Sequence, residues 1–149
     1  MNIKGKYAIA APASTIWPLL QDPVVLARIT PGISRLDLTG PDEYKAISEI
    51  SIGPVRGSFA GDLRVKDKIE EQTMTLTFDL KSKIGNAISE IKIDLVPTED
   101  QKTEVIYNGS AKLSGTIARM GQRILGGVIK TLSKEVFKKL EKEIEQNKS

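Results

Sequence analysis

The carboxy-terminal segment, from about residue 114 to residue 146, most strongly limits what this chain can fold into. Its apolar side chains recur at a strict spacing of four: Met120, Ile124, Val128, Leu132, Val136, Leu140 and Ile144. This row predicts one long helix over 114–146. Because an α-helix has 3.6 residues per turn, the row slips about 40° around the axis at each step. A slipping row fits a strongly twisted sheet that curls around one helix better than it fits a straight helical bundle.

The rest of the chain consists of short extended segments separated by turn residues. Apolar and polar side chains alternate in seven segments, which predicts strands over 2–10, 33–39, 43–53, 55–66, 72–83, 87–96 and 103–113. Gly53-Pro54 and Gly85-Asn86 mark two of the tight turns between strands. Two short helices are predicted over 14–21 and 23–28, because the residue before Pro23 resists the helical region. Short connections favour antiparallel pairing of the strands.

These elements predict an α+β fold in which a seven-stranded antiparallel sheet wraps around the long carboxy-terminal helix, with two short helices after the first strand. A chain of 149 residues without a linker or an internal repeat is the size of one domain, so we expect 1–149 to form a single domain. Trp17 shares helical spacing with Leu20 and Val24. We interpret it as a core residue between the short helices and the sheet rather than as a ligand-stacking residue.

The composition removes most catalytic chemistry. The chain has no cysteine and no histidine, so it cannot build a thiolate nucleophile, a Cys-type zinc site or a histidine base. We therefore expect no metal and no cofactor. The net charge of +3 comes from interspersed lysines and acids, which is not the pattern of a nucleic-acid-binding surface. We find no signal peptide and no stretch of ~20 apolar residues, so we expect a soluble, cytoplasmic protein.

Carboxylates within the strands fall on one face of the predicted sheet. Asp62, Asp79, Glu90 and Asp94 alternate with apolar residues, so we predict that all four face solvent. Asp62 and Asp79 lie on neighbouring strands and could form an acid–base pair. A solvated pair balanced by Arg64 and nearby lysines is the favoured interpretation. Because no acid or base faces inward, we predict that the protein is not an enzyme.

The inward face of the sheet is apolar with a few hydroxyl groups. Such a surface suits a lipophilic ligand with a polar head, although each hydroxyl can instead bond a local backbone group. We predict a cavity of roughly a few hundred Å³ between the sheet and the first half of the long helix. The predicted ligand-binding residues are Phe59, Leu63, Met74, Phe78, Ser89, Tyr107, Ile117, Met120, Gly121 and Ile124.

Gly121 lies on the predicted sheet-facing stripe of the helix. Glycine costs roughly 1 kcal/mol relative to alanine inside a helix, so we consider two reasons for it. One is close packing of helix and sheet, and the other is space left for a ligand. The second reason predicts that Gly121→Leu keeps or raises stability while it weakens ligand binding.

Several offset motifs carry a resemblance to a known family. Ala11-Pro12 is followed by Trp17, Asp22-Pro23, Leu26 and Pro31-Gly32, and then by a second signature made of Gly40-Pro41-Asp42-Glu43-Tyr44, Ile52-Gly53-Pro54, Gly57, Phe59 and Gly61. Over nearly its whole length the chain resembles the family of the G subunit of carbon monoxide dehydrogenase. That family is a branch of the helix-grip superfamily, also called START-like or Bet v 1-like.

The resemblance implies a function and partners. Members of this family accompany molybdenum-containing carbon monoxide dehydrogenases and related hydroxylases, and are implicated in membrane attachment and in carrying quinone-type electron acceptors. The resemblance thus implies a cavity for a quinone or another isoprenoid lipid. The alternative is a maturation or docking factor for such an enzyme, with no dedicated ligand.

The resemblance also bears on membrane contact. Relatives often carry a Pro/Gly-rich extension with an apolar anchor, whereas this sequence stops at Ser149, so we expect at most peripheral contact with the inner face of the membrane. The helix end at 130–142 is amphipathic and carries several lysines, which glutamates such as Glu135 and Glu141 dilute. It could lie on an anionic membrane, but a solvated helix end is the favoured interpretation.

Overall fold

Seven strands form one antiparallel sheet in the order β1-β7-β6-β5-β4-β3-β2. The structure is a computed structural model that describes residues 1–147. Its elements are β1 (Asn2–Ile9), α1 (Ala13–Gln21), α2 (Pro23–Ile29), β2 (Ile33–Gly40), β3 (Glu43–Ile52), β4 (Val55–Ile69), β5 (Thr73–Ser82), β6 (Gly85–Pro97), β7 (Thr103–Leu113), a 3₁₀ turn η1 (Ile117–Arg119) and α3 (Gln122–Gln146).

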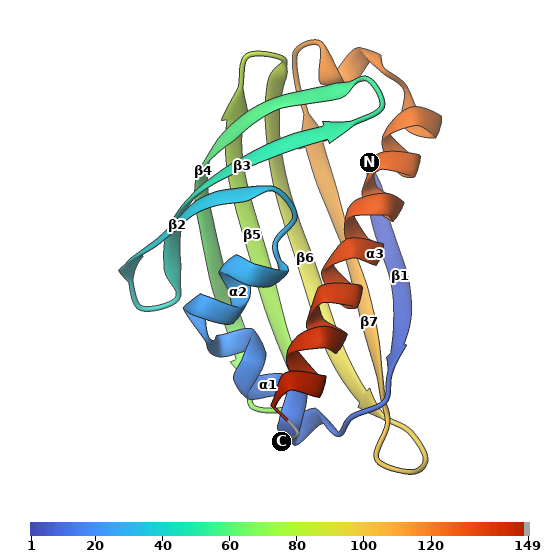
Figure 1. Ribbon diagram of the computed structural model, residues 1–149. Coiled ribbons are helices and arrows are strands. Elements are labelled where there is room, and N and C mark those ends of the chain that lie inside the picture. Colours follow the sequence, from blue (N-terminus) through green and yellow to red (C-terminus); the bar gives the residue numbers. More distant parts are fainter. Residues whose placement is uncertain (148–149) are drawn as a thin grey trace.

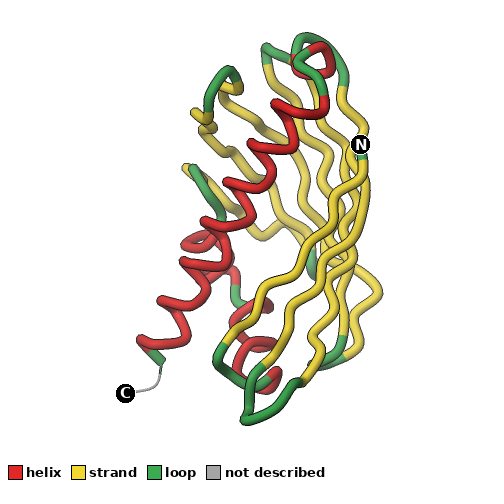
Figure 2. Tube along the Cα trace, turned by 90° about the vertical axis from the view of Figure 1, so that its right-hand side faces the viewer, coloured by secondary structure: helices red, strands yellow, loops and turns green. Residues whose placement is uncertain are grey.

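The long helix α3 crosses the concave face of the sheet, and α1 and α2 close one end of the molecule (Figures 1 and 2). This arrangement confirms the predicted fold class and the order of its elements. The sequence explains where α1 ends and α2 begins. Asp22 ends α1 and caps α2, since its side chain accepts a hydrogen bond of 2.9 Å from the Val24 amide, and Pro23 occupies the first turn.

Gly61 of β4 lies against the backbone of β5. A Cβ atom placed on Gly61 would lie 1.9 Å from the carbonyl oxygen of Asp79, a distance that no side chain tolerates. Glycine is therefore required at this position of the sheet.

The long helix begins later than the sequence predicts. The structure places its first residue at Gln122 rather than near residue 114, and a 3₁₀ turn and irregular backbone precede it. Gly115 and Gly121 both have positive φ angles, of 72° and 84°, which a right-handed helix cannot contain. Gly121 is the amino-terminal cap of α3 and lies outside the helical stripe, so the predicted placement of Gly121 inside the helix is wrong.

The apolar core is divided into two clusters. The larger one joins α1, α2 and the carboxy-terminal half of α3 to the sheet, and it contains Trp17, which is 8% exposed. The smaller one lies under the amino-terminal half of α3 and contains Val55, Phe59, Ile117, Leu125 and Val128. Burial of Trp17 confirms its interpretation as a core residue.

Aromatic and ionic contacts hold the carboxy-terminal half of α3 against β1, β7 and α2. The ring of Phe137 stacks on Tyr7 of β1 at 4.8 Å and lies 5.7 Å from the ring of Tyr107. The Tyr7 hydroxyl donates a hydrogen bond of 2.8 Å to Glu141. Nearby, the buried carboxylate of Glu143 forms an ion pair of 3.1 Å with Arg28 of α2. None of these contacts reaches the first half of the helix.

Candidate hydrophobic cavity

A cavity of about 260 Å³ lies between the concave face of the sheet and the amino-terminal half of α3. Its lining is almost entirely apolar and comes from most of the strands together with η1 and α3. The lining residues are Ile3, Ser48, Ile50, Val55, Phe59, Phe78, Leu80, Ala87, Ser89, Ala111, Leu113, Ile117, Leu125, Val128, Ile129 and Leu132. The cavity therefore has the position and the size that the sequence predicts.

Four of the predicted binding residues line this cavity: Phe59, Phe78, Ser89 and Ile117. The positions of the three strand residues follow from alternation, which places β4, β5 and β6 residues of one parity on the concave face. Strand parity therefore identifies the concave face of the sheet, but not which part of that face borders the cavity.

The other six predicted residues lie elsewhere. Leu63 and Met74 are buried in the larger cluster, and Tyr107 packs there beside Phe137. Met120 contacts the smaller cluster without reaching the cavity. Gly121 is exposed with open space around it, and Ile124 is 44% exposed. Because α3 begins only at Gln122, Met120 and Gly121 precede the helix, and within it Leu125 is buried rather than Ile124.

The α3 residues that border the cavity were not among the predicted binding residues. Leu125 and Val128 are buried over the cavity, and Ile129 and Leu132 border it. Leu125, Val128 and Leu132 recur at spacings of three and four, which is the usual pattern of a buried helical face. A mixed spacing, rather than the strict row through Ile124, would have found them.

The hydroxyl groups in the cavity wall already donate to local backbone. Ser48 donates to the carbonyl of Pro31 at 2.8 Å, and Ser89 donates to the carbonyl of Ser110 at 2.9 Å. These serines retain only acceptor capacity toward a ligand. The cavity thus offers apolar contact with little polar recognition.

Charged side chains stay outside the cavity. No Asp, Glu, Lys or Arg belongs to its lining in the part of the chain that the structure describes. Asp79 and Glu90 are exposed, and Asp62 and Asp94 are half-buried in ion pairs with lysines, so none of the four strand carboxylates is buried. Among residues 1–147, no group of three acids is arranged to hold a metal ion.

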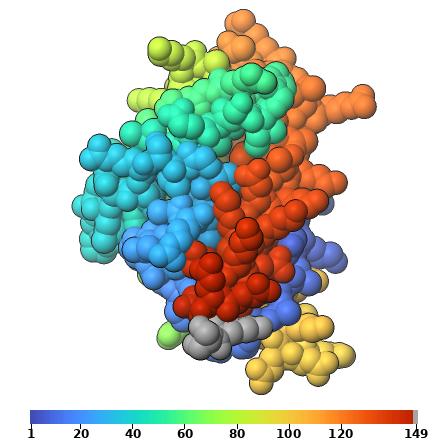
Figure 3. All heavy atoms as spheres, in the orientation of Figure 1, coloured from blue at the N-terminus to red at the C-terminus, as the bar shows by residue number. Residues whose placement is uncertain are grey.

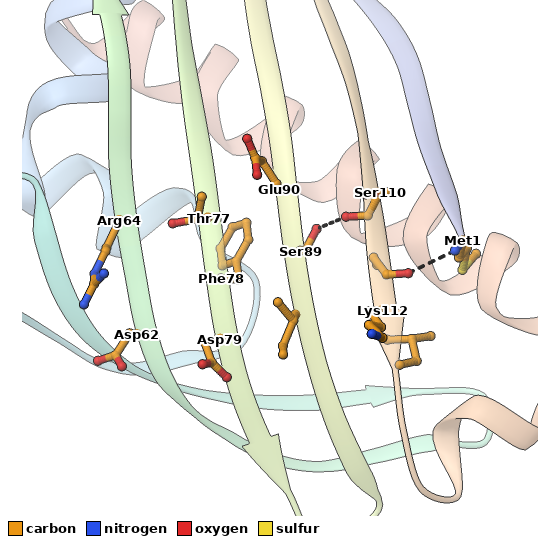
Figure 4. A pocket seen from close by; sticks show the side chains of 13 residues that line it. Met1, Asp62, Arg64, Thr77, Phe78, Asp79, Ser89, Glu90, Ser110 and Lys112 are labelled. Carbon is orange, nitrogen blue, oxygen red and sulfur yellow. Dashed lines mark hydrogen bonds between the residues drawn. The ribbon is translucent and has the colours of Figure 1, made fainter.

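The convex face of the sheet carries a larger depression of about 780 Å³ (Figure 4). Asp62 of β4 and Asp79 of β5 lie side by side in it as cross-strand neighbours. Asp62 accepts a hydrogen bond from Lys45, which together with the positive charge of Lys45 and Arg64 holds the pKa of its carboxyl below the ordinary value. Asp62 is thus a charged surface carboxylate paired with Lys45, and Asp79 beside it is exposed, which favours the solvated interpretation of the pair.

Three solved structures share this architecture. A conserved protein from Geobacillus kaustophilus is 34% identical, with a TM-score of 0.95 over 98% of this chain and 96% of that one. A START superfamily protein from Mycobacterium smegmatis is 16% identical, with a TM-score of 0.76 over 97% of each chain. The Zhui aromatase/cyclase from a Streptomyces species is 12% identical, with a TM-score of 0.71 over 100% of this chain and 96% of that one.

The fold and its hollow concave face define a START-like protein of the helix-grip class. A family model for the G subunit of carbon monoxide dehydrogenase (CoxG) matches residues 5–145, so the chain belongs to this family. No protein of curated function matches the sequence. Family and fold together indicate a ligand-binding role, although the class also contains enzymes such as the aromatase/cyclase. None of the helices described is both long and apolar enough to cross a membrane.

Proposed function

We propose that this protein binds a quinone or another isoprenoid lipid in the cavity under α3, without catalysing a reaction on it. The observation that carries the proposal is the cavity itself: about 260 Å³ of space bordered almost entirely by apolar side chains, with no charged residue in its lining. The cavity is open to solvent on one side, so its apolar walls rather than its volume distinguish it from the other hollows of the surface, which include charged side chains. Apolar walls that face water gain free energy when an apolar ligand covers them, which supports a binding site for such a ligand.

The size of the cavity limits which part of a lipid enters it. An apolar cavity of ~150 Å³ holds one benzene ring, so 260 Å³ suits a fused two-ring head group or a short isoprenoid segment. A long isoprenoid tail exceeds this volume. Ile50 of β3 and Ile129 and Leu132 of α3 are only half-buried along the border, and they supply the apolar surface over which a tail leaves the cavity.

The family supports a partner for this activity. We propose that the protein serves a molybdenum-containing carbon monoxide dehydrogenase or a related hydroxylase, acting in the cytoplasm at the inner face of the membrane. The ligand would then be the electron acceptor of that enzyme, or a biosynthetic precursor of the acceptor. The absence of His and Cys from the whole sequence supports carriage rather than chemistry.

Extraction and titration test the binding proposal. Organic extracts of the purified protein are analysed by mass spectrometry, and the stripped protein is titrated with a short-chain menaquinone analogue and with a lipophilic dye. We expect stoichiometric uptake of both. A protein that yields no lipid and takes up neither probe would refute the proposal and favour a docking or maturation role.

Replacement of two alanines by phenylalanine, one inside the cavity and one outside, localises the site. Ala87 lines the cavity, whereas Ala60 is exposed on the convex face of β4. Ala87→Phe places a ring in the cavity and should weaken binding about tenfold or more, which equals about 1.4 kcal/mol. Ala60→Phe makes the same chemical change outside the cavity and should leave binding unaltered. Equal affinity of the two variants would show that the ligand binds elsewhere.

A further inference from the structure

The cavity end of the molecule carries more positive than negative charge. The stretches 50–58, 80–88 and 111–126 meet there, and together they contain six Lys and Arg residues and no Asp or Glu. The nearest carboxylates, among them Asp62 and Asp79, lie on the convex face of the sheet. Because the other 16 cations and all 19 acids lie outside these stretches, the remainder of the chain has a net charge of −3, although the total charge is +3.

These six cations form a surface that we name the basic end. It comprises the exposed side chains of Arg56, Lys81, Lys83, Lys112, Arg119 and Arg123. Its segments are contiguous: the amide of Ile117 donates to the carbonyl of Ile84 at 2.9 Å, which joins η1 to the β5–β6 turn. Arg56, Lys81 and Lys83 border one surface depression. In Figure 3 the orange side chains around residues 115–125 project beyond the body of the molecule.

The cations of the basic end are free of ion pairs. Seven ion pairs connect residues within 1–147, and each uses a lysine or arginine from another part of the chain, such as Arg28, Lys45 or Lys92. The charges of Arg56, Lys83, Arg119 and Arg123 are therefore available to an external anion, whereas Lys81 and Lys112 lie nearer to Asp62 and Asp79. Several such charges on one surface attract an anionic partner over a distance of about 8–10 Å at ordinary ionic strength.

Apolar side chains lie among these cations. Ile124 is 44% exposed beside Arg123, and Met120 is half-buried beside Arg119. Mixed cationic and apolar residues are typical of surfaces that bind the interface of an anionic bilayer. A surface for single-stranded nucleic acid would instead need exposed aromatic rings for stacking. The three stretches contain no aromatic residue.

We propose that the basic end docks on an anionic lipid bilayer, with the phosphates of the head groups contacting its cations and Ile124 entering the interface. Docking in this orientation points the cavity end of α3 toward the lipid phase. A role of this docking in ligand transfer rests on the proposed function, whereas the docking itself requires no bound ligand. The surface is distinct from the helix end at 130–142, where glutamates dilute the charge.

Vesicle sedimentation tests the docking surface. The full chain is mixed with vesicles of phosphatidylcholine alone or with one quarter phosphatidylglycerol, at low and high salt. We expect binding only to the anionic vesicles, with loss at high salt. The triple variant Lys83→Glu, Arg119→Glu, Arg123→Glu should lower the partition coefficient by about 100-fold or more, since each cation near an anionic surface contributes about a factor of five.

A matched control separates this surface from net charge. Lys102→Glu, Lys138→Glu and Lys142→Glu change the total charge equally, but these exposed lysines lie in the other parts of the chain. The control should retain most of the binding. Equal loss in both triple variants, binding independent of lipid charge, or tighter binding to duplex DNA than to the anionic vesicles would overturn the proposal.

Dye uptake by the same variants distinguishes the two proposals. None of the substituted residues lines the cavity, so the stripped triple variant should take up lipophilic dye as the wild type does. Vesicle binding without dye uptake would refute the lipid-binding function and leave the docking surface intact. Dye uptake without vesicle binding would refute the docking surface alone.

Discussion

Gly121 shows how a single residue can mislead an interpretation based on spacing. Its φ and ψ angles of 84° and 155° lie in a region that is essentially restricted to glycine. There is nothing within 4 Å of a Cβ atom placed there, so neither close packing nor ligand space explains the residue. Backbone geometry at the start of α3 requires it. This geometry therefore predicts that Gly121→Leu lowers stability, instead of keeping or raising it.

We predict that Gly121→Ala lowers the free energy of unfolding by roughly 1–3 kcal/mol, because alanine strains the backbone at this position. Gly126, inside α3 and also surrounded by open space, is the matched control. Gly126→Ala should raise stability by up to about 1 kcal/mol, since alanine is the better helix former. Urea unfolding of both variants measures the difference. Stabilisation by both substitutions would contradict the assignment of Gly121 as a strained cap.

At the level of elements, the two halves of α3 differ in how they are held. Phe137 packs against the rings of Tyr7 and Tyr107, whereas Ile124 faces outward near the start of the helix. We predict that Phe137→Ala costs about 3–5 kcal/mol of stability, the usual range for removing a core ring. Ile124→Ala on the same helix should cost less than about 0.5 kcal/mol.

Chemical denaturation of both variants tests this contrast, and Phe137→Leu serves where the alanine variant does not fold. The leucine variant should remain folded with an intermediate loss. Similar costs at Phe137 and Ile124 would show that the helix is held evenly along its length, contrary to the contacts described above.

The elements themselves were largely predictable from the sequence, because period-two alternation and turn residues act locally. The seven strands, the two short helices and the burial of Trp17 all follow from such local signals. The start of α3 could not be predicted in this way, because the spacing of apolar residues carries no information on the positive φ angles of Gly115 and Gly121. Strand parity selected three residues that line the cavity and three that lie in the larger cluster instead. The spacing of four passed over Leu125, so the part of α3 that borders the cavity was not predicted.

At the scale of the whole molecule, the fold favours the protonated form of two tyrosines, which links the free energy of unfolding to pH. The hydrogen bond to Glu141 and partial burial raise the pKa of Tyr7 above its ordinary value of 10.0. Burial, together with the nearby charge of Asp42, raises the pKa of Tyr44 in the same direction. A raised pKa in the folded state stabilises the protein below pH 10, and this contribution is lost as the pH rises through the folded value.

We therefore predict that the free energy of unfolding declines above about pH 10 and that Tyr7→Phe makes the decline shallower. Lysines also titrate in this range, but they do so in both proteins and cancel in the difference. Urea unfolding of wild type and Tyr7→Phe at about pH 9 and pH 11 measures the effect. Parallel declines would show that the bond between Tyr7 and Glu141 does not bear on stability.

The division of the core into a solid cluster and a hollow one also bears on how such a protein can evolve. Residues that hold the fold, such as Trp17 and Phe137, are separate from those that border the cavity, such as Ala87 and Val128. Substitutions in the hollow half can alter the shape of the cavity while the solid half keeps the chain folded. One ancestral scaffold of this kind can acquire new ligands through a few changes, without passing through unfolded intermediates.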